Sequence, residues 1–438
     1  MNKKVRNCLL IVASLLMIVF CVALGNGKAN VVNKSEVNSA KASAASMEPD
    51  TTRYMQENTE LGTYGDVLMS TQEPLYASET DAEQVEDFAV DEVDSFMAGM
   101  STEDKVAQLF FITPDALTGT EGVTMAGDAT KTAIEDIPVG GIIYMGDNLQ
   151  SHTQVKEMLS NTNTYSMDRV GLPMFMAVDE EGGTVARIAG SGRFGVKDVG
   201  NMADIGATGT VDDARQAGAS IGNYLSDLGF NIDFAPVADV LSNSENSIVK
   251  YRSFGSDPEK VSEMSVAVAD GLKSEGIDAV YKHFPGHGAT AGDTHVGAAF
   301  TNKTYEELAA DELVPFQNAI DNGAKYIMVA HISAPNLTGH DTPASLSDIV
   351  VTDILRDKMG YDGLVITDAM HMGAISSKYS SDEAAVMAIQ AGVDIILMPE
   401  DFHKAYEGVL SAVNSGEISE ERLNESVRRI LEVKLEME

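Results

Sequence analysis

The sequence predicts an α/β protein with a single catalytic domain built as a (β/α)8 barrel. Three observations support this fold class. Short apolar runs recur along the chain, longer amphipathic stretches separate them, and eight such units occupy about 340 residues, within the size range of a barrel with insertions. An open, doubly wound parallel sheet is the alternative, because it is also built from alternating strands and helices.

The eight apolar runs are continuous and do not alternate with polar residues, which is typical of parallel strands buried on both faces. They occupy residues 106–112, 140–145, 173–179, 230–237, 278–284, 325–332, 363–370 and 393–399. The stretches 211–229 and 257–276 are helix-like, and each ends in glycine, as helices often do. The stretch 418–438 is predicted to be an amphipathic helix that closes the barrel.

The chain divides into three parts by composition. Residues 1–29 combine a basic start with a long apolar run, which indicates a signal peptide or membrane anchor. Residues 30–84 are polar and increasingly acidic, which indicates a flexible linker. Residues 85–438 form the predicted catalytic domain. Both cysteines, Cys8 and Cys21, precede the linker, so we expect no disulfide in this domain.

The formal net charge of −37 excludes several kinds of partner. A strongly acidic surface repels nucleic acid and anionic lipid, so we expect no nucleic-acid binding and membrane contact only through the N-terminal segment. We expect a monomer that is exported and is extracellular, associated with the cell wall, or tethered to a membrane on its outer face. The charge itself is explained by solubility.

Polar residues stand at the ends of five predicted strands. They are Asp179 with Arg187, Asp239, Lys282 with His283, His331 and Asp368. Because barrel enzymes build their active sites at the C-terminal ends of strands, this set predicts an active site there. Any one of these acids could instead cap the following helix.

The segment 282–295, "KHFPGHGATAGDTH", holds three of the eight histidines. His283 and His287 have a spacing seen in zinc sites, but Pro285 prevents a regular helix and no glutamate follows the metalloprotease pattern. The glycines do not match a phosphate-binding loop. We therefore expect neither a metal nor a cofactor.

Acid–base chemistry fits this segment better. Asp293 lies two residues before His295, and a carboxylate beside an imidazole orients the ring and favours its protonated form. Such a histidine can donate a proton to a leaving group and then accept one from water. Asp368 is a candidate nucleophile or electrostatic partner, and the two groups together suit glycoside hydrolysis.

Several motifs in the same order resemble glycoside hydrolase family 3, and most closely its β-N-acetylglucosaminidase (β-hexosaminidase) branch. They are "DEEGGTVAR", "FAPVADV", "YRSFGSDP", "KHFPGHGATAGDTH", "PASLS" and "LVITDAM". The resemblance covers roughly residues 85–438 and implies a (β/α)8 barrel. The other large branch takes its acid/base from a second domain, whereas this sequence carries the His/Asp loop.

The resemblance implies a retaining mechanism. Asp368 would be the nucleophile, and His295, paired with Asp293, would be the acid/base. The residues that would bind the sugar in the cleaving subsite are Asp179, Arg187, Arg252, Lys282 and His283. His287 would hold the loop. Two departures are Thr184, where relatives often have a long side chain, and the sequence "VGAA" after His295.

We therefore predict an exported hydrolase that removes terminal β-linked N-acetylglucosamine from cell-wall muropeptides or chitooligosaccharides. Two alternatives stay open. One is phosphorolysis, since an imidazole repels an attacking phosphate less than a glutamate would. The other is a tethered sugar-binding barrel without catalysis, although such a protein needs no acid/base pair.

Overall fold

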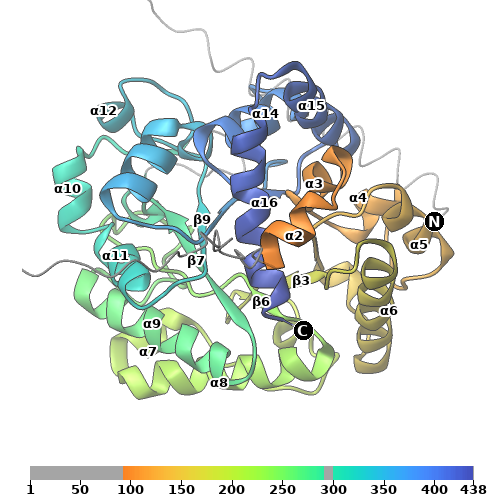
Figure 1. Ribbon diagram of the computed structural model, residues 1–438. Coiled ribbons are helices and arrows are strands. Elements are labelled where there is room, and N and C mark those ends of the chain that lie inside the picture. Colours follow the sequence, from red (N-terminus) through yellow and green to blue (C-terminus); the bar gives the residue numbers. More distant parts are fainter. Residues whose placement is uncertain (1–91, 291–298, 438) are drawn as a thin grey trace, which may run out of the picture. The chain divides into compact units, whose positions relative to one another are not determined.

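The computed structural model describes residues 92–290 and 299–437, which lie in one compact unit spanning residues 85–438 (Figure 1). The predicted signal segment and linker lie outside the described residues, as do Asp293 and His295. Within the described part of the chain, no helix combines the length and apolarity needed to cross a membrane.

Eight parallel strands form the barrel, as the sequence predicts. In spatial order they run β11-β9-β7-β6-β3-β2-β1-β12. Their bounds are β1 (Phe110–Ile112), β2 (Gly141–Ile143), β3 (Phe175–Val178), β6 (Ile232–Asp233), β7 (Asp278–Phe284), β9 (Tyr326–Val329), β11 (Leu364–Thr367) and β12 (Ile396–Leu397). The two ends of the sheet meet through a parallel bridge between Ile366 and Ile395, so the sheet closes and an open doubly wound sheet is ruled out.

Each of the eight apolar runs contains one of these strands, but the runs are longer than the strands. The run 106–112 begins in helix α3 (Thr102–Gln108), and the run 230–237 contains only the two-residue strand β6. Apolar residues continue past the strands because the segments that leave the barrel are also buried: Phe234, Ala235 and Val237 are almost inaccessible to solvent.

Helices cover the outside of the barrel (Figure 1). The longer ones are α5 (Asp128–Asp136), α6 (His152–Val170), α8 (Val211–Leu228), α9 (Pro258–Ser274), α11 (Val314–Asp321), α14 (Ser381–Ala391), α15 (Phe402–Ser415), α16 (Glu420–Leu435) and the π-helical segment η5 (Ile349–Lys358). Shorter helices are α2 (Glu92–Ala98), α4 (Pro114–Thr118), α7 (Met202–Thr208), α10 (Tyr305–Ala310), α12 (Pro335–Thr338) and α13 (Gly373–Ser376). The first described helix, α2, packs beside the last, α16.

Local sequence explains where the predicted helices begin and end. The Thr210 side chain accepts a hydrogen bond from the Asp213 backbone and so caps α8, while Asp257 and the following Pro258 start α9. The two helices pack with their backbones close together. A Cβ atom at Gly218 would lie 2.2 Å from the carbonyl oxygen of Val268, so only glycine fits there.

Two short strand pairs lie outside the barrel. Strands β4 (Glu180–Gly182) and β5 (Val185–Ala186) form an antiparallel hairpin directly after β3, and β8 (Ala299–Phe300) pairs with β10 (Ile332–Ser333). The β4–β5 hairpin is important for the site because it follows a barrel strand at its C-terminal end.

Candidate active site

A cavity of about 560 Å³ opens at the C-terminal end of the barrel. Residues from or just beyond β3, β7 and β11 line it, together with the segment between β6 and α9. The polar lining residues include Asp179, Glu181, Thr184, Arg187, Arg252, Lys282, His283, Asp368 and His371. Apolar side chains, among them Phe234, Met328 and Leu397, complete the wall.

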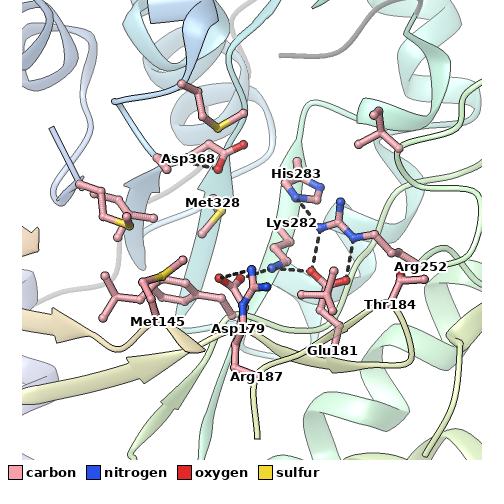
Figure 2. Close-up of a pocket in the computed structure, with 18 of the residues that line it drawn as sticks. Met145, Asp179, Glu181, Thr184, Arg187, Arg252, Lys282, His283, Met328 and Asp368 are labelled. Carbon is pink, nitrogen blue, oxygen red and sulfur yellow. Dashed lines mark hydrogen bonds and ion pairs between the residues drawn. The ribbon is translucent and has the colours of Figure 1, made fainter. Parts of the chain in front are cut away.

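Four charged side chains form a continuous set of ion pairs along one wall (Figure 2). The Lys282 ammonium lies 2.8 Å from Asp179 Oδ1 and 2.7 Å from Glu181 Oε1. Arg252 donates to both oxygens of Glu181 through Nε and Nη2, each at 2.7 Å. This two-pronged contact fixes the plane of the Arg252 guanidinium.

The network shifts the pKa values of Glu181 and Lys282 in the directions that favour their charged forms. Burial alone would raise the pKa of Glu181, but Arg252 and Lys282 hold it far below its usual range. Burial likewise opposes the charge on Lys282, yet the carboxylates of Asp179 and Glu181 raise its pKa. Charges that are held in place in a cavity with little solvent interact more strongly with the hydroxyls of a ligand than the same charges would in bulk water.

His283 is held by a carboxylate behind the wall. Its Nδ1 lies 2.7 Å from Oδ2 of Asp239, which is fully buried, and its Nε2 lies 3.2 Å from the Arg252 guanidinium. Asp239 Oδ1 also accepts a hydrogen bond from the backbone of His287 at 2.6 Å. Asp239 therefore contacts the His283 ring and the His287 backbone at once.

A register shift in β7 brings neighbouring side chains to the same cavity. Successive residues in a regular strand point to opposite faces. The pairing of β7 with β9 shifts between Lys282 and Phe284, and both Lys282 and His283 line the cavity.

Asp368 stands across the cavity from this network, one residue beyond β11 (Figure 2). Its Oδ1 accepts a hydrogen bond from the Ala369 backbone at 2.8 Å. Burial would raise its pKa, but His283, His331, the Ala369 amide and Lys282 lower that pKa to about 2. The lowered pKa favours the ionised carboxylate, which is the form that a nucleophile or an electrostatic partner needs.

Arg187 reaches the cavity from beyond β5 and has unused hydrogen-bonding capacity. Its Nη2 lies 3.9 Å from Asp179 Oδ2, and its buried Nε has no hydrogen-bond partner among the described residues. A buried donor without a partner is costly, which favours a ligand group at this position.

The structure brings together six of the eight predicted site residues: Asp179, Arg187, Arg252, Lys282, His283 and Asp368. Asp293 and His295 lie outside the described residues. His331 is not in the cavity wall; it is buried, with Nδ1 2.7 Å from Ser345 Oγ and Nε2 3.1 Å from the Ala369 carbonyl. Burial lowers its pKa, and the contact of its Nε2 with the Ala369 carbonyl supports the turn after β11.

Sequence reasoning missed Glu181, although it quoted the motif that contains it. Neighbouring Glu180 points away and accepts hydrogen bonds from the backbones of Ile188 and Ala189 and from the Tyr224 hydroxyl. Two acidic residues after a strand are a usable signal, but only the hairpin geometry shows which one faces Lys282.

Among residues 92–290 and 299–437, no group of three or more His, Cys, Asp or Glu side chains is placed to hold a metal ion. The arrangement places a half-buried carboxylate with a lowered pKa on one side of the cavity and a dense set of donors and acceptors on the other. This geometry suits a neutral, hydroxyl-rich ligand with an electrophilic carbon beside Asp368.

The chain matches a known family over most of its length. Residues 101–433 match the model of the glycosyl hydrolase family 3 N-terminal domain. The chain is 34% identical to Beta-hexosaminidase LpqI of Mycobacterium tuberculosis over 346 residues, which cover 76% of this chain and 83% of the relative. It is 32% identical to Beta-hexosaminidase A of Pseudoalteromonas piscicida over 68% of this chain, but spans only about half (54%) of that protein.

Comparison with solved structures identifies the same family. A glycoside hydrolase family 3 beta-N-acetylglucosaminidase from Paenibacillus sp. FPU-7 superposes with a TM-score of 0.72 at 36% sequence identity. The match covers 77% of this chain and 63% of the Paenibacillus chain.

Proposed function

Because the chain belongs to glycosyl hydrolase family 3, we propose that it is a retaining exo-β-N-acetylglucosaminidase. The observation that carries this proposal is Asp368, a half-buried carboxylate with a lowered pKa, which stands at a strand end and faces a wall of charged and polar groups. The relatives named beta-hexosaminidase support the same activity. Terminal β-linked N-acetylglucosamine is the proposed substrate group.

In the first proposed step, an Asp368 carboxylate oxygen attacks the anomeric carbon. The bond from that carbon to the glycosidic oxygen breaks, and His295 protonates the departing oxygen. The product is a covalent glycosyl–Asp368 ester. The low pKa of Asp368 favours this role, because the carboxylate is present without prior deprotonation.

In the second proposed step, His295 accepts a proton from water, and the water oxygen attacks the anomeric carbon. The ester bond breaks, Asp368 is restored, and the sugar leaves with its original anomeric configuration. Asp293 is proposed to orient the His295 ring and to favour its protonated form.

The proposed sugar contacts use the opposite wall. The Asp179 carboxylate can accept from two adjacent hydroxyls, while Arg187, Lys282 and Arg252 can donate to hydroxyls or to the acetamido carbonyl. His283, fixed by Asp239, adds a ring nitrogen at a set position. Glu181 joins this set as the residue that positions Lys282 and Arg252.

We further propose that the enzyme acts outside the cell on muropeptides or chitooligosaccharides. The basic and apolar N-terminal segment, residues 1–29, is the proposed export signal or anchor, and the acidic residues 30–84 are the proposed linker. Cell fractionation with N-terminal sequencing tests this part. A cytoplasmic protein with an intact N-terminus would refute it.

A panel of aryl β-glycosides tests the activity. Turnover of the N-acetylglucosaminide, with the glucoside and xyloside at least about a hundredfold slower in kcat/KM, is the expected result. Turnover of none of them would favour the non-catalytic barrel. Repeating the assay with phosphate distinguishes the reactions: free N-acetylglucosamine means hydrolysis, and its 1-phosphate means phosphorolysis.

The acid/base assignment has its own test. In His295→Ala, kcat should fall much more for substrates with poor leaving groups than for aryl glycosides with acidic phenols, because the latter need no protonation. Equal losses for both leaving groups would remove His295 from the acid role without affecting the assignment of Asp368.

A further inference from the structure

The mouth of the cavity carries an exposed aromatic ring that the proposed mechanism does not use. Tyr251 lines the cavity and is 53% exposed, whereas the other cavity-lining aromatic side chain, Phe234, is 1% exposed. The exposed part of the Tyr251 side chain is therefore accessible to a ligand in the cavity.

The segment that bears Tyr251 is rigidly held. Oδ1 of Asn246 accepts hydrogen bonds from the backbones of Ile248 at 2.9 Å and Val249 at 3.1 Å. The Val249 carbonyl in turn accepts from Arg252 at 2.9 Å, and the Tyr251 carbonyl accepts from Ala203 at 3.3 Å. Because the backbone is already fixed, little conformational entropy is lost when a ligand contacts the ring. Tyrosine side chains therefore provide a large contact area with a small entropy loss.

Tyr251 is also the neighbour of a residue that is fixed at the inner wall. The two 2.7 Å contacts between Arg252 and Glu181 hold residue 252 at the site where the first sugar is proposed to bind. Tyr251 precedes Arg252 in the chain and is much more exposed to solvent. Thr184, which lines the same cavity, is short, so it covers little of the area that a longer side chain would occupy.

We propose that Tyr251 is the stacking platform for the sugar ring on the leaving-group side of the scissile bond. This inference rests on the proposed function and names the residue that selects a sugar leaving group. One face of a pyranose ring presents C–H groups, and an aromatic ring packs against that face without needing a charge. The Tyr251 side chain is 53% exposed in the cavity, so its ring is accessible for this contact.

The experiment compares two substrates that differ only beyond the scissile bond. Methyl β-N-acetylglucosaminide has almost no leaving-group surface, whereas chitobiose has a complete second sugar ring. In Tyr251→Ala, KM for chitobiose should rise about tenfold more than KM for the methyl glycoside. Tyr251→Phe, which keeps the ring and loses the hydroxyl, should match the wild type within about twofold.

A second readout is independent of turnover. In the Asp368→Asn background, Tyr251→Ala should weaken chitobiose binding about tenfold and leave the affinity for free N-acetylglucosamine nearly unchanged, measured by calorimetry. Met125→Ala is the matched control, since Met125 is exposed, apolar and absent from the cavity lining; it should change neither value.

Three outcomes would overturn the proposal. Equal losses for both substrates would place Tyr251 at the first sugar or in a structural role. No loss for either would leave the ring without a function in binding. If Tyr251→Phe weakened the use of both substrates, the Tyr251 hydroxyl and not the ring would be the group that contacts them. If the wild type cleaves neither substrate nor any aryl glycoside, the proposed function itself fails, which is a different result.

Discussion

Both ends of the barrel hold a buried carboxylate among cations, but the two ends are built differently. At the C-terminal end, Glu181 binds Lys282 and Arg252 beside an open cavity. At the N-terminal end, just before β12, Asp394 contacts Arg356 at 2.5 Å, Arg429 at 3.3 Å and Arg422 at 3.7 Å. In both clusters the cations lower the pKa of a carboxylate that burial would raise.

The two clusters differ in whether any hydrogen-bonding group is left unpaired and available to a ligand. Asp394 also accepts hydrogen bonds from the Ser426 hydroxyl and the Val365 backbone, so its oxygens are fully used in joining β11, η5 and α16. At the open end, the buried Nε of Arg187 has no partner among the described residues. A network in which every donor and acceptor is paired within the protein stabilises the fold. A network with an unpaired donor beside a cavity is available to bind a ligand.

The largest expected effect is at Asp368. Replacing it with Ala should lower kcat by a factor of about 10⁴ or more, because the proposed covalent intermediate forms on the Asp368 carboxylate. The assay is steady-state turnover of aryl N-acetylglucosaminide. Denaturant unfolding of Asp368→Asn should stay within about 1 kcal/mol of wild type. Turnover near the wild-type rate would reject the nucleophile assignment.

The corresponding prediction for the N-terminal end of the barrel concerns Asp394. Asp394→Ala leaves three buried or half-buried arginines without their shared carboxylate, so we expect the free energy of unfolding to fall by about 3–5 kcal/mol. Folded protein at low temperature should keep nearly wild-type KM. If Asp394→Ala instead raised KM with normal stability, the distinction between the two ends of the barrel would be wrong.

A smaller effect is expected at Arg252. Arg252→Lys keeps a positive charge but loses the two-pronged contact with Glu181, and kcat/KM should fall about 10–100-fold. Arg215→Lys is the matched control, since Arg215 pairs with Asp270 on the surface with both side chains about half exposed. Parallel losses in the two variants would show that the effect is not specific to the cavity.

The smallest effect concerns pH and Lys434 of α16. This side chain is fully buried, donates to the Gly140 carbonyl at 2.8 Å and lies 4.7 Å from the centre of the Phe175 ring. Burial lowers its pKa to about 7. Between about pH 7 and the ordinary lysine pKa near 10.4, the unfolded chain binds more protons than the folded one, so this group makes stability rise with pH.

Lys434→Met tests this contribution. The variant should be more stable than the wild type at pH 7 by about 1–3 kcal/mol, and its advantage should shrink as the pH approaches 10. Urea unfolding at several pH values measures the difference. An advantage that does not depend on pH would mean that packing, and not the buried charge, sets the effect.

The sequence predicted the eight strands and the helices α8, α9 and α16 because these depend on nearby residues. Continuous apolar runs, the cap at Thr210 and the Asp257–Pro258 start of α9 act over a few positions in the chain. It also placed Asp179, Lys282 and Asp368 at strand ends, and strand ends meet at one rim in any such barrel.

Only the tertiary structure decided which charges are paired. Lys282 and Asp179 are 103 residues apart, and Arg252 and Glu181 are 71 apart, so no local pattern connects them. The same is true of Asp394, which reads as part of an apolar strand until three distant arginines surround it. Local sequence fixes the strands and helices, whereas closure of the barrel determines whether a buried charge faces a partner or an open cavity.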